Sequence, residues 1–418
     1  MKRRRVVMTG LGVVAPNGIG KEKFANALFS GQLGIRKIFS PSDPKPPCHV
    51  VARVADFNPS TIFIQRNRHA GKSMSRVSQF AVASAKMALD DAGIDLAKLN
   101  PRRTGICYGT TTGKPDFDDD AARFSESGIA GLEPTAWAEF SPHAPASHIA
   151  REFDFSGPVA TCSAGCCTGL TVMDWGANQI ADSRFDTMLI GSGDSLLSPL
   201  VLAALSAGKL LTRQSDPTNA SRPYDLHRDG LVPGEAAGAI VLESHEAATE
   251  RKARIYAEYL GSAATVDVHR SGERDHSGQG LARAIGGALE SAGLRPDQID
   301  CINAHGLSHP VFDLEETQGF KSGLGKAAYC LSITSIKSMT GASFAGDGML
   351  QIISSCLILE QGLIPPILNL ETPDPACDLD YVVAKPRTAR VNHILTNTRA
   401  LGGSNAVLIL GRVDSGPK

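Results

Sequence analysis

The strongest constraint on the fold of this chain is an internal echo between its first and second halves. The pattern Ala-Leu-x-x-Ala-Gly followed by Ile or Leu occurs twice, as ALDDAGI from residue 88 and ALESAGL from residue 288. Each copy predicts an amphipathic helix that ends at a glycine, Gly93 or Gly293, where a left-handed residue is favourable. An apolar run that predicts a buried strand follows in each case, Gly105–Tyr108 and Asp300–Asn303. Helices that end in glycine are common, so this echo alone leaves coincidence open.

A second, weaker echo follows the first in each half. The segments CSAGCCTGLTVMDWGANQIA and SIKSMTGASFAGDGMLQIISSCLIL both run from a turn of small residues into a long apolar helix. Two echoes in the same order favour duplication over coincidence. Continuous apolar runs such as DTMLIGSG and AVLILG indicate sheets covered on both faces. We therefore expect an α/β fold of two similar halves, residues 1–250 and 251–418, which share one core because no low-complexity linker separates them.

The composition is that of an ordinary globular protein. The 418 residues carry a formal net charge of −1, which gives no argument for nucleic acid or a membrane surface as a partner. The N-terminal MKRRRVVMTGLGVV predicts a buried first strand rather than an export signal, and no run reaches the ~20 apolar residues of a membrane helix. Nine cysteines without a framework spacing then indicate reduced thiols and a cytoplasmic location.

Three of these cysteines lie in the stretch TCSAGCCTGL, residues 161–170. The stretch predicts a strand end and a turn, after which Cys166 or Cys167 begins a helix whose dipole and free backbone N–H groups favour the nucleophilic thiolate. Inert packing is the alternative for any single cysteine. A zinc site is disfavoured because no Cys-x-x-Cys or His-x₃-His pair stands nearby.

A nucleophilic cysteine needs a partner that stabilises the thiolate or handles protons. The candidate is His305 in INAHGLSH, because it follows a predicted strand directly and catalytic residues gather at such edges. A loop histidine whose hydrogen bonds are satisfied structurally is the alternative.

Six ordered blocks connect the chain to a known family. The chain resembles β-ketoacyl-ACP synthases of the type II kind, and the ketosynthase subunits of type II polyketide systems. The resemblance implies the thiolase fold, a duplicated five-layer α-β-α-β-α core. It also implies dimers, without a bound cofactor or metal, that take acyl groups from the phosphopantetheine of an acyl carrier protein. The blocks are VVMTGLGVVAPNG from residue 6, GPVATCSAGCCTGL from 157, SRPYDLHRDGLVPGEAAG from 221, INAHG from 302, TSIKSMTG from 334 and GGSN from 402.

The resemblance also assigns roles residue by residue. The family's nucleophile falls on Cys166, its first catalytic histidine on His305 and its catalytic lysine on Lys337. A structural glutamate that contacts the lysine region falls on Glu316. The oxyanion hole is expected from the backbone N–H of Cys166 and from one near Leu401.

The chain departs from the family pattern at the chemistry. Ala342 stands where the family has a second histidine, which with the first supports malonyl decarboxylation; alanine can neither donate a hydrogen bond nor carry a proton. Leu307 and His309 replace two threonines that bind the pantetheine arm, and His309 is a weaker candidate to replace the missing histidine. In the gate segment NTRALGG, which includes Leu401, Arg399 replaces an aromatic residue and either pairs with a carboxylate substrate or pairs structurally.

Three functions fit this pattern. The first is a ketosynthase-type condensing enzyme whose malonyl decarboxylation is weakened or altered. The second is an acyltransferase that forms the Cys166 thioester and passes the acyl group to another nucleophile without decarboxylation. The third is a partner subunit like the chain-length factor of a ketosynthase heterodimer. The family resemblance sets retained Cys166, His305 and Lys337 against the third, because such partners usually lose the cysteine.

The expected partners are an acyl carrier protein, an acyl thioester and a second subunit, in a homodimer or a ketosynthase-type heterodimer. Carrier proteins are acidic, and the basic residues near the family's docking positions are Arg66, Arg68, Lys72, Lys209 and Arg213. A solvated charged loop is the alternative for such residues.

Overall fold

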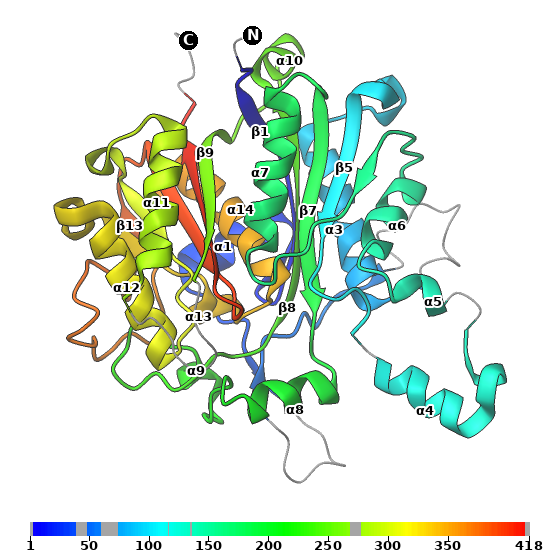
Figure 1. The fold of residues 1–418 in the computed structure, drawn as a ribbon, viewed down its shortest axis with the longest axis horizontal. Helices are drawn as coiled ribbons and strands as arrows, with labels where there is room; N and C mark the ends of the chain where they lie inside the picture. The colour runs from blue at the N-terminus through cyan, green and yellow to red at the C-terminus, as the bar shows by residue number, and fades with distance from the viewer. Residues whose placement is uncertain are drawn as a thin grey trace.

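The computed structural model describes residues 3–38, 48–59, 74–115, 117–133, 136–267 and 277–413. One mixed sheet runs through this part of the chain (Figure 1). Its strands in spatial order are β11 (Ser332–Thr334), β10 (Cys301–Asn303), β14 (His393–Arg399), β15 (Ser404–Gly411), β9 (Ala257–Val266), β1 (Val6–Ala15), β8 (Glu235–Ser244), β7 (Thr187–Ser195), β5 (Thr104–Gly109) and β6 (Val159–Ala160). The short strand β2 (Gly18–Ile19) pairs with β1, and two small ladders join β3 (Arg36–Lys37) to β4 (Val50–Val51) and β12 (Leu363–Ile364) to β13 (Arg387–Thr388).

The sheet has two matching arms. Outward from the centre, the first arm runs β1, β8, β7, β5, β6 and the second runs β9, β15, β14, β10, β11. In both arms the two inner pairings are antiparallel and the two outer pairings are parallel. The arms join where Val6–Met8 of β1 pairs with β9. The predicted duplicated α/β fold is therefore confirmed, while the division at residue 250 stays a prediction.

The principal helices repeat in the same way. Helices α3 (Arg76–Ala92) and α11 (Gln279–Ala292) each cover the outer face of one arm, and each ends at a left-handed glycine, as predicted from the first echo. Helices α7 (Thr168–Ala181) and α14 (Ala345–Gln361) contact each other between the two arms (Figure 1). The resulting order of layers, α-β-α-β-α, is that of the expected thiolase fold.

Two glycines bring the central helices into backbone contact. A Cβ added at Gly169 in α7 would lie 2.5 Å from the backbone nitrogen of Met349 in α14, and one added at Gly348 would lie 2.9 Å from the Leu170 side chain. Both helices are apolar and largely buried because they are enclosed by both arms. This contact places the N-terminal end of α7 beside that of α14, and the candidate site is built there.

The first strand is fully buried, as predicted for the N-terminal segment. Within the described residues, no helix is both long enough and apolar enough to cross a membrane. The other α-helices are α1 (Lys21–Ser30), α4 (Phe117–Ser127), α5 (Ala136–Glu139), α6 (Ala144–Glu152), α8 (Pro199–Ala207), α9 (Pro217–Ala220), α10 (His245–Glu250), α12 (Pro310–Leu324) and α13 (Lys337–Thr340).

Candidate active site

Cys166 lies in a tight turn between β6 and α7. Gly165 has a φ of 57°, a left-handed conformation that favours glycine. The Thr168 hydroxyl accepts a hydrogen bond from the Ala164 N–H at 2.9 Å and donates one to the Gly165 carbonyl at 2.6 Å. Helix α7 begins at Thr168 with Cys167 as its N-cap residue, slightly later than predicted. Cys166 therefore precedes the helix rather than opening it.

The surroundings of Cys166 favour the thiol over the thiolate. The residue is only 6% exposed, and burial raises the pKa of its thiol well above the usual value. The Asp347 carboxylate raises this pKa further, whereas the Lys337 ammonium lowers it. Burial and the Asp347 carboxylate therefore oppose the stabilisation of the thiolate that was expected from the helix end.

The other two cysteines of the stretch contact different parts of the chain. The Cys167 sulfur lies 3.4 Å from the carbonyl oxygens of Thr398 and Ser404, between α7 and the second arm. The Cys162 sulfur lies 3.8 Å from that of Cys107 on β5. Cys162 is half-buried, and its hydrogen bond with Cys107 lowers the pKa of its thiol to about 7. The choice of Cys166 as the nucleophile therefore rests on the family resemblance and stays a prediction.

Glu316 on α12 holds the loop that carries His305. Its carboxylate accepts hydrogen bonds from the backbone N–H groups of His305 at 2.8 Å and Gly306 at 2.9 Å. The Tyr224 hydroxyl and the Asn397 amide donate to it at 2.7 and 2.6 Å. These four donors come from the histidine loop, Tyr224 and Asn397, and the expected contact of Glu316 with the lysine region stays a prediction.

The His305 ring is buried and neutral. Neither ring nitrogen has a hydrogen-bond partner among the described residues. Burial, together with the positive charges of Lys337 and Arg399, lowers the pKa of the imidazole well below its usual value. A neutral ring offers one N–H donor and one acceptor, the form suited to exchange a proton with a thiol or substrate.

Lys337 opens α13 and is buried between two residues of α14. Its ammonium donates to the Gln351 side-chain oxygen at 3.3 Å and lies 3.6 Å from the Asp347 Oδ2. The other Asp347 oxygen accepts from the Ser343 N–H at 2.6 Å and the Ser343 hydroxyl at 2.9 Å. Burial raises the pKa of Asp347, and Lys337 opposes that rise. Sequence reasoning missed Asp347 and Gln351; their spacing, four residues apart in the first half of a largely apolar helix, was the available signal.

The position of the missing histidine is apolar. Ala342 and Leu307 are each 4% exposed and belong to one hydrophobic cluster together with Phe312. His309 caps α12, with its Nδ1 accepting from the Val311 N–H at 3.2 Å and its ring packed edge-on against Phe312. That engagement favours a structural role for His309 over replacement of the missing histidine.

Arg399 is buried among carboxylates of the protein itself. Its guanidinium lies 2.9 Å from Glu315 and 3.6 Å from Asp267, and it donates to the Asn405 side chain at 2.9 Å. These contacts favour the structural alternative over a salt bridge to substrate. Arg399 also lines a cavity of about 230 Å³ together with the half-exposed Leu401.

The turn that contains Leu401 lies against the cysteine turn. A Cβ added at Gly165 would be 3.3 Å from the Ala400 side chain. This proximity supports the expected oxyanion hole formed by backbone N–H groups of Cys166 and Leu401, which stays a prediction.

The basic docking residues divide into two groups. Arg66, Arg68 and Lys72 lie outside the described residues. Lys209 and Arg213 are exposed beyond the end of α8, and Arg213 lies 3.9 Å from Asp229. Docking through these residues stays a prediction.

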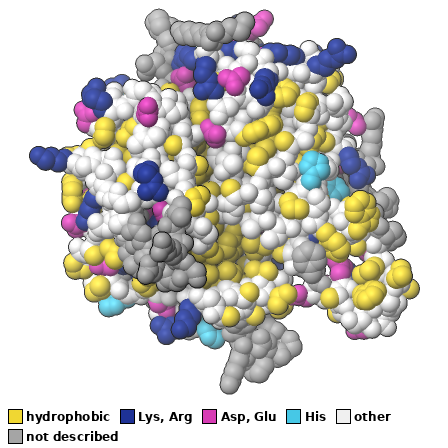
Figure 2. Space-filling model, viewed as in Figure 1, with side chains coloured by type: hydrophobic (Ala, Val, Ile, Leu, Met, Phe, Trp, Pro, Cys, Tyr) yellow, Lys and Arg dark blue, Asp and Glu magenta, His cyan; other side chains and the backbone are white. Residues whose placement is uncertain are grey.

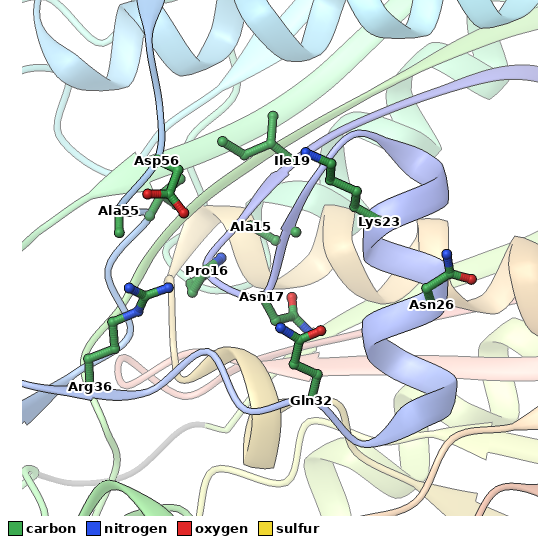
Figure 3. Close-up of a pocket in the computed structure, with 12 residues that line it drawn as sticks. Ala15, Pro16, Asn17, Ile19, Lys23, Asn26, Gln32, Arg36, Ala55 and Asp56 are labelled. Atoms are coloured by element: carbon green, nitrogen blue, oxygen red, sulfur yellow. The ribbon is translucent and has the colours of Figure 1, made fainter.

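A separate cavity of about 330 Å³ lies between the β1–β2 turn and α1 (Figure 3). Polar side chains of Asn17, Lys23, Gln32 and Arg36 line it, and none of the predicted site residues does. The described part of the chain contains no cluster of three His, Cys, Asp or Glu side chains that could hold a metal ion.

Comparisons with known proteins match the chain along nearly its whole length. Residues 3–248 match the N-terminal domain of β-ketoacyl synthases and residues 256–371 match the C-terminal domain. The tetracenomycin polyketide synthase ketoacyl synthase alpha subunit of Streptomyces glaucescens is 37% identical, over 98% of this chain and 97% of the relative. The 3-oxoacyl-[acyl-carrier-protein] synthase 2 of Coxiella burnetii is 33% identical, over 99% of this chain and all of the relative.

A solved structure agrees with these relatives. It is a type II polyketide synthase acyl-carrier protein in complex with its ketosynthase bound to the hexaketide, and the matched chain superposes with a TM-score of 0.88. The match has 30% identity and covers 99% of this chain and all of that one. With the duplicated fold and the cysteine turn, the histidine loop and the lysine gathered at its centre, these matches show that the chain belongs to the β-ketoacyl synthase family and is a ketosynthase-like condensing enzyme of polyketide or fatty-acid biosynthesis.

Proposed function

We propose that Cys166 accepts an acyl group from the phosphopantetheine thioester of an acyl carrier protein, and that malonyl decarboxylation in the second half-reaction is weak or altered. The observation that carries this proposal is the grouping of Cys166, His305 and Lys337 in one buried site. The charge on Lys337 acts on both the Cys166 thiol and the His305 ring. The histidine position that would complete decarboxylation is the apolar Ala342.

In the acylation step, Cys166 attacks the carbonyl carbon of the thioester. The new bond to the Cys166 sulfur forms as the bond to the pantetheine sulfur breaks, and the proton of the cysteine passes to the departing thiol. Neutral His305 is the candidate to carry that proton, and Lys337 favours the transient thiolate. Backbone N–H groups of Cys166 and Leu401 are the candidates to stabilise the oxyanion, on the order of 3 kcal/mol each.

The second half-reaction lacks the second histidine of the family, because Ala342 stands at its position. Loss of a positioned donor or acid typically lowers a rate by roughly 10²-fold or more. A non-decarboxylating acyltransferase is therefore the second candidate function. The chain-length-factor-like alternative is weaker because the cysteine turn, the histidine loop and the lysine are all retained in one site.

An acyl carrier protein and a second subunit are the proposed partners. The relative from Streptomyces glaucescens is named an alpha subunit, and the similar solved ketosynthase is in complex with its carrier protein. The segment around α4 and α5 exposes large apolar side chains, with Ile129 84%, Trp137 76% and Phe124 52% exposed. Figure 2 shows hydrophobic side chains gathered over α4 at the lower right. An apolar surface of this kind is suited to bury against another subunit, whether identical or not.

Intact-protein mass spectrometry tests the acylation step. Wild-type protein incubated with acyl-carrier protein, or with an acyl N-acetylcysteamine thioester, should gain one acyl mass. Cys166→Ala should gain none, while the matched control Cys162→Ala should still be acylated. Absence of an adduct on wild type, or its persistence in Cys166→Ala, would remove the proposal.

Exchange of Lys209 and Arg213 for Glu tests the docking prediction. The change should raise KM for the carrier-bound thioester and leave KM for the small thioester unaltered. An equal rise for both substrates would contradict docking at these residues.

A further inference from the structure

We infer that Asp347 determines the class of the second substrate: the acceptor of the acyl group carries no free carboxylate at its reacting end. The inference rests on the proposed acylation of Cys166 and selects, for the second half-reaction, the non-decarboxylating transfer named above as the second candidate function. It depends on a count of the charges that surround the cysteine and on the polarity of the wall formed by Ala342.

Asp347 is already paired with Lys337, the cation whose charge acts on the Cys166 thiol. The Asp347 Oδ2 lies 3.6 Å from the Lys337 ammonium, and no hydrogen-bond donor among the described residues satisfies this oxygen. Both side chains are nearly fully buried, with 2% and 3% exposure. Both also act electrostatically on the Cys166 thiol. An incoming carboxylate would therefore meet an ammonium whose charge is balanced and a carboxylate that repels it.

The other charged groups near the site offer no replacement. Arg399, whose charge reaches His305, is paired with Glu315 and Asp267. The His305 imidazole is held neutral by burial and by these same cations. Among the described residues whose charge reaches Cys166 or His305, each cation thus has a carboxylate of the protein as its partner.

The wall at the missing histidine is also unsuited to a carboxylate. Ala342 and Leu307 pack with Phe312, Leu211 and Leu231 in one buried apolar cluster. A carboxylate placed against such a surface loses its hydration without gaining a donor, which is among the most expensive changes a buried group can undergo.

The acceptor that fits is therefore neutral and bears hydrogen on the carbon, nitrogen or oxygen that attacks. The bond between the acyl carbon and the Cys166 sulfur breaks, a bond to the acceptor atom forms, and the hydrogen of that atom leaves as a proton. Neutral His305 can receive this proton and pass it to the Cys166 sulfur, which restores the thiol. No carbon dioxide is released, and no oxidant or reductant is needed.

The decisive variant is Asp347→Asn, which can keep the oxygen that accepts from Ser343 and replaces the charged oxygen opposite Lys337 by a neutral amide nitrogen. Carbon dioxide release from malonyl-carrier protein is measured per acylated Cys166, with the adduct quantified by mass spectrometry in the same sample. We expect release at least tenfold above wild type, and we expect the double variant Asp347→Asn with Gln351→Glu to return towards wild type because a carboxylate again faces Lys337. The exposed Asp297→Asn is the matched control and should behave as wild type. Equal release by Asp347→Asn and wild type overturns the inference.

A second measurement uses wild-type protein alone, so it does not depend on the folding of a variant. Two pantetheine analogues of equal size, one ending in a malonyl carboxylate and one in the corresponding neutral amide, are compared as protectors of Cys166 against iodoacetamide. The amide should protect at a concentration at least tenfold lower; equal protection by the two, or better protection by the acid, overturns the inference. Failure of Cys166 to form any acyl adduct would instead remove the proposed function, so the two failures are distinguishable.

Discussion

The backbone N–H of His305 donates a 2.8 Å hydrogen bond to Glu316, so the loop that carries the candidate proton carrier is fixed by a carboxylate on the following helix. The same carboxylate accepts from Gly306, Tyr224 and Asn397. None of these four donors is a group assigned to the reaction. Glu316 therefore affects the reaction by fixing the position of His305.

Replacement of Glu316 by Ala should lower the free energy of unfolding by about 3–5 kcal/mol, because several buried donors lose their acceptor. Glu316→Gln keeps part of the acceptor capacity and should cost less. Urea denaturation followed by circular dichroism gives the free energies, and acylation of the folded fraction gives the effect on the site. A loss below about 1 kcal/mol in Glu316→Ala would contradict the role assigned to this carboxylate.

The Cys166 thiol should alkylate slowly at neutral pH. Its pKa is raised by burial and by Asp347, so the reactive thiolate forms only as the pH rises above the usual range of a cysteine. Lys337→Met removes the cation that lowers this pKa and should shift the profile to still higher pH. Iodoacetamide labelling of the Cys166 peptide from pH 6 to about 10, followed by mass spectrometry, measures both profiles. A wild-type alkylation rate that is already constant above pH 7 would show that the pKa of the Cys166 thiol is not raised.

The contact between α7 and α14 predicts a sharp asymmetry between two glycine substitutions. Gly169→Ala places a Cβ 2.5 Å from the Met349 backbone nitrogen and should destabilise the fold by about 3 kcal/mol or more. Gly286→Ala on α11 is the matched control, because a Cβ there meets nothing within 4 Å and alanine favours the helix by about 0.5–1 kcal/mol. Thermal unfolding should therefore move in opposite directions for the two variants. Similar shifts in both would mean that the helices are not in backbone contact.

Removal of the Arg399 charge should destabilise the protein rather than change its substrate preference. Arg399→Met leaves Glu315 and Asp267 buried without their cation, which typically costs about 3–5 kcal/mol. Arg399→Lys keeps the charge and should recover part of the loss. Denaturation curves give the stability, and acylation kinetics with charged and neutral thioesters give the preference. A stable Arg399→Met variant that rejects only carboxylate-bearing thioesters would restore the substrate-pairing alternative.

The fold was open to prediction because its evidence is local and repeated. Gly93 and Gly293 end equivalent helices with left-handed residues, and the strands after them occupy equivalent places in the two arms. Apolar periodicity, helix ends and the repeated order of helix and strand suffice to predict a duplicated α/β fold. The exact helix start at Thr168 was missed because the side chain of that threonine, rather than the dipole of the helix, organises the turn.

The hydrogen-bond and ion-pair partners of the site residues were much harder to predict from the sequence. Motifs located Cys166, His305 and Lys337, but the group that faces Lys337 depends on how the first turn of α14 packs against α13. The hydrogen bonds by which Glu316 holds the histidine loop were not expected from the sequence. The burial that raises the pKa of the Cys166 thiol arises from segments far apart in the chain, and no local sequence pattern contains it.

The backbone contact between α7 and α14 has a consequence for how the site is assembled. The turn before α7 supplies the thiol, and segments later in the chain supply the imidazole, the ammonium and the carboxylate opposite it. The spacing of these groups therefore depends on how the two helices pack against each other. A small shift of one helix against the other would move the nucleophile away from the groups that assist it without changing any reacting residue, so the close packing at Gly169 and Gly348, beside the site, fixes the geometry of the reaction.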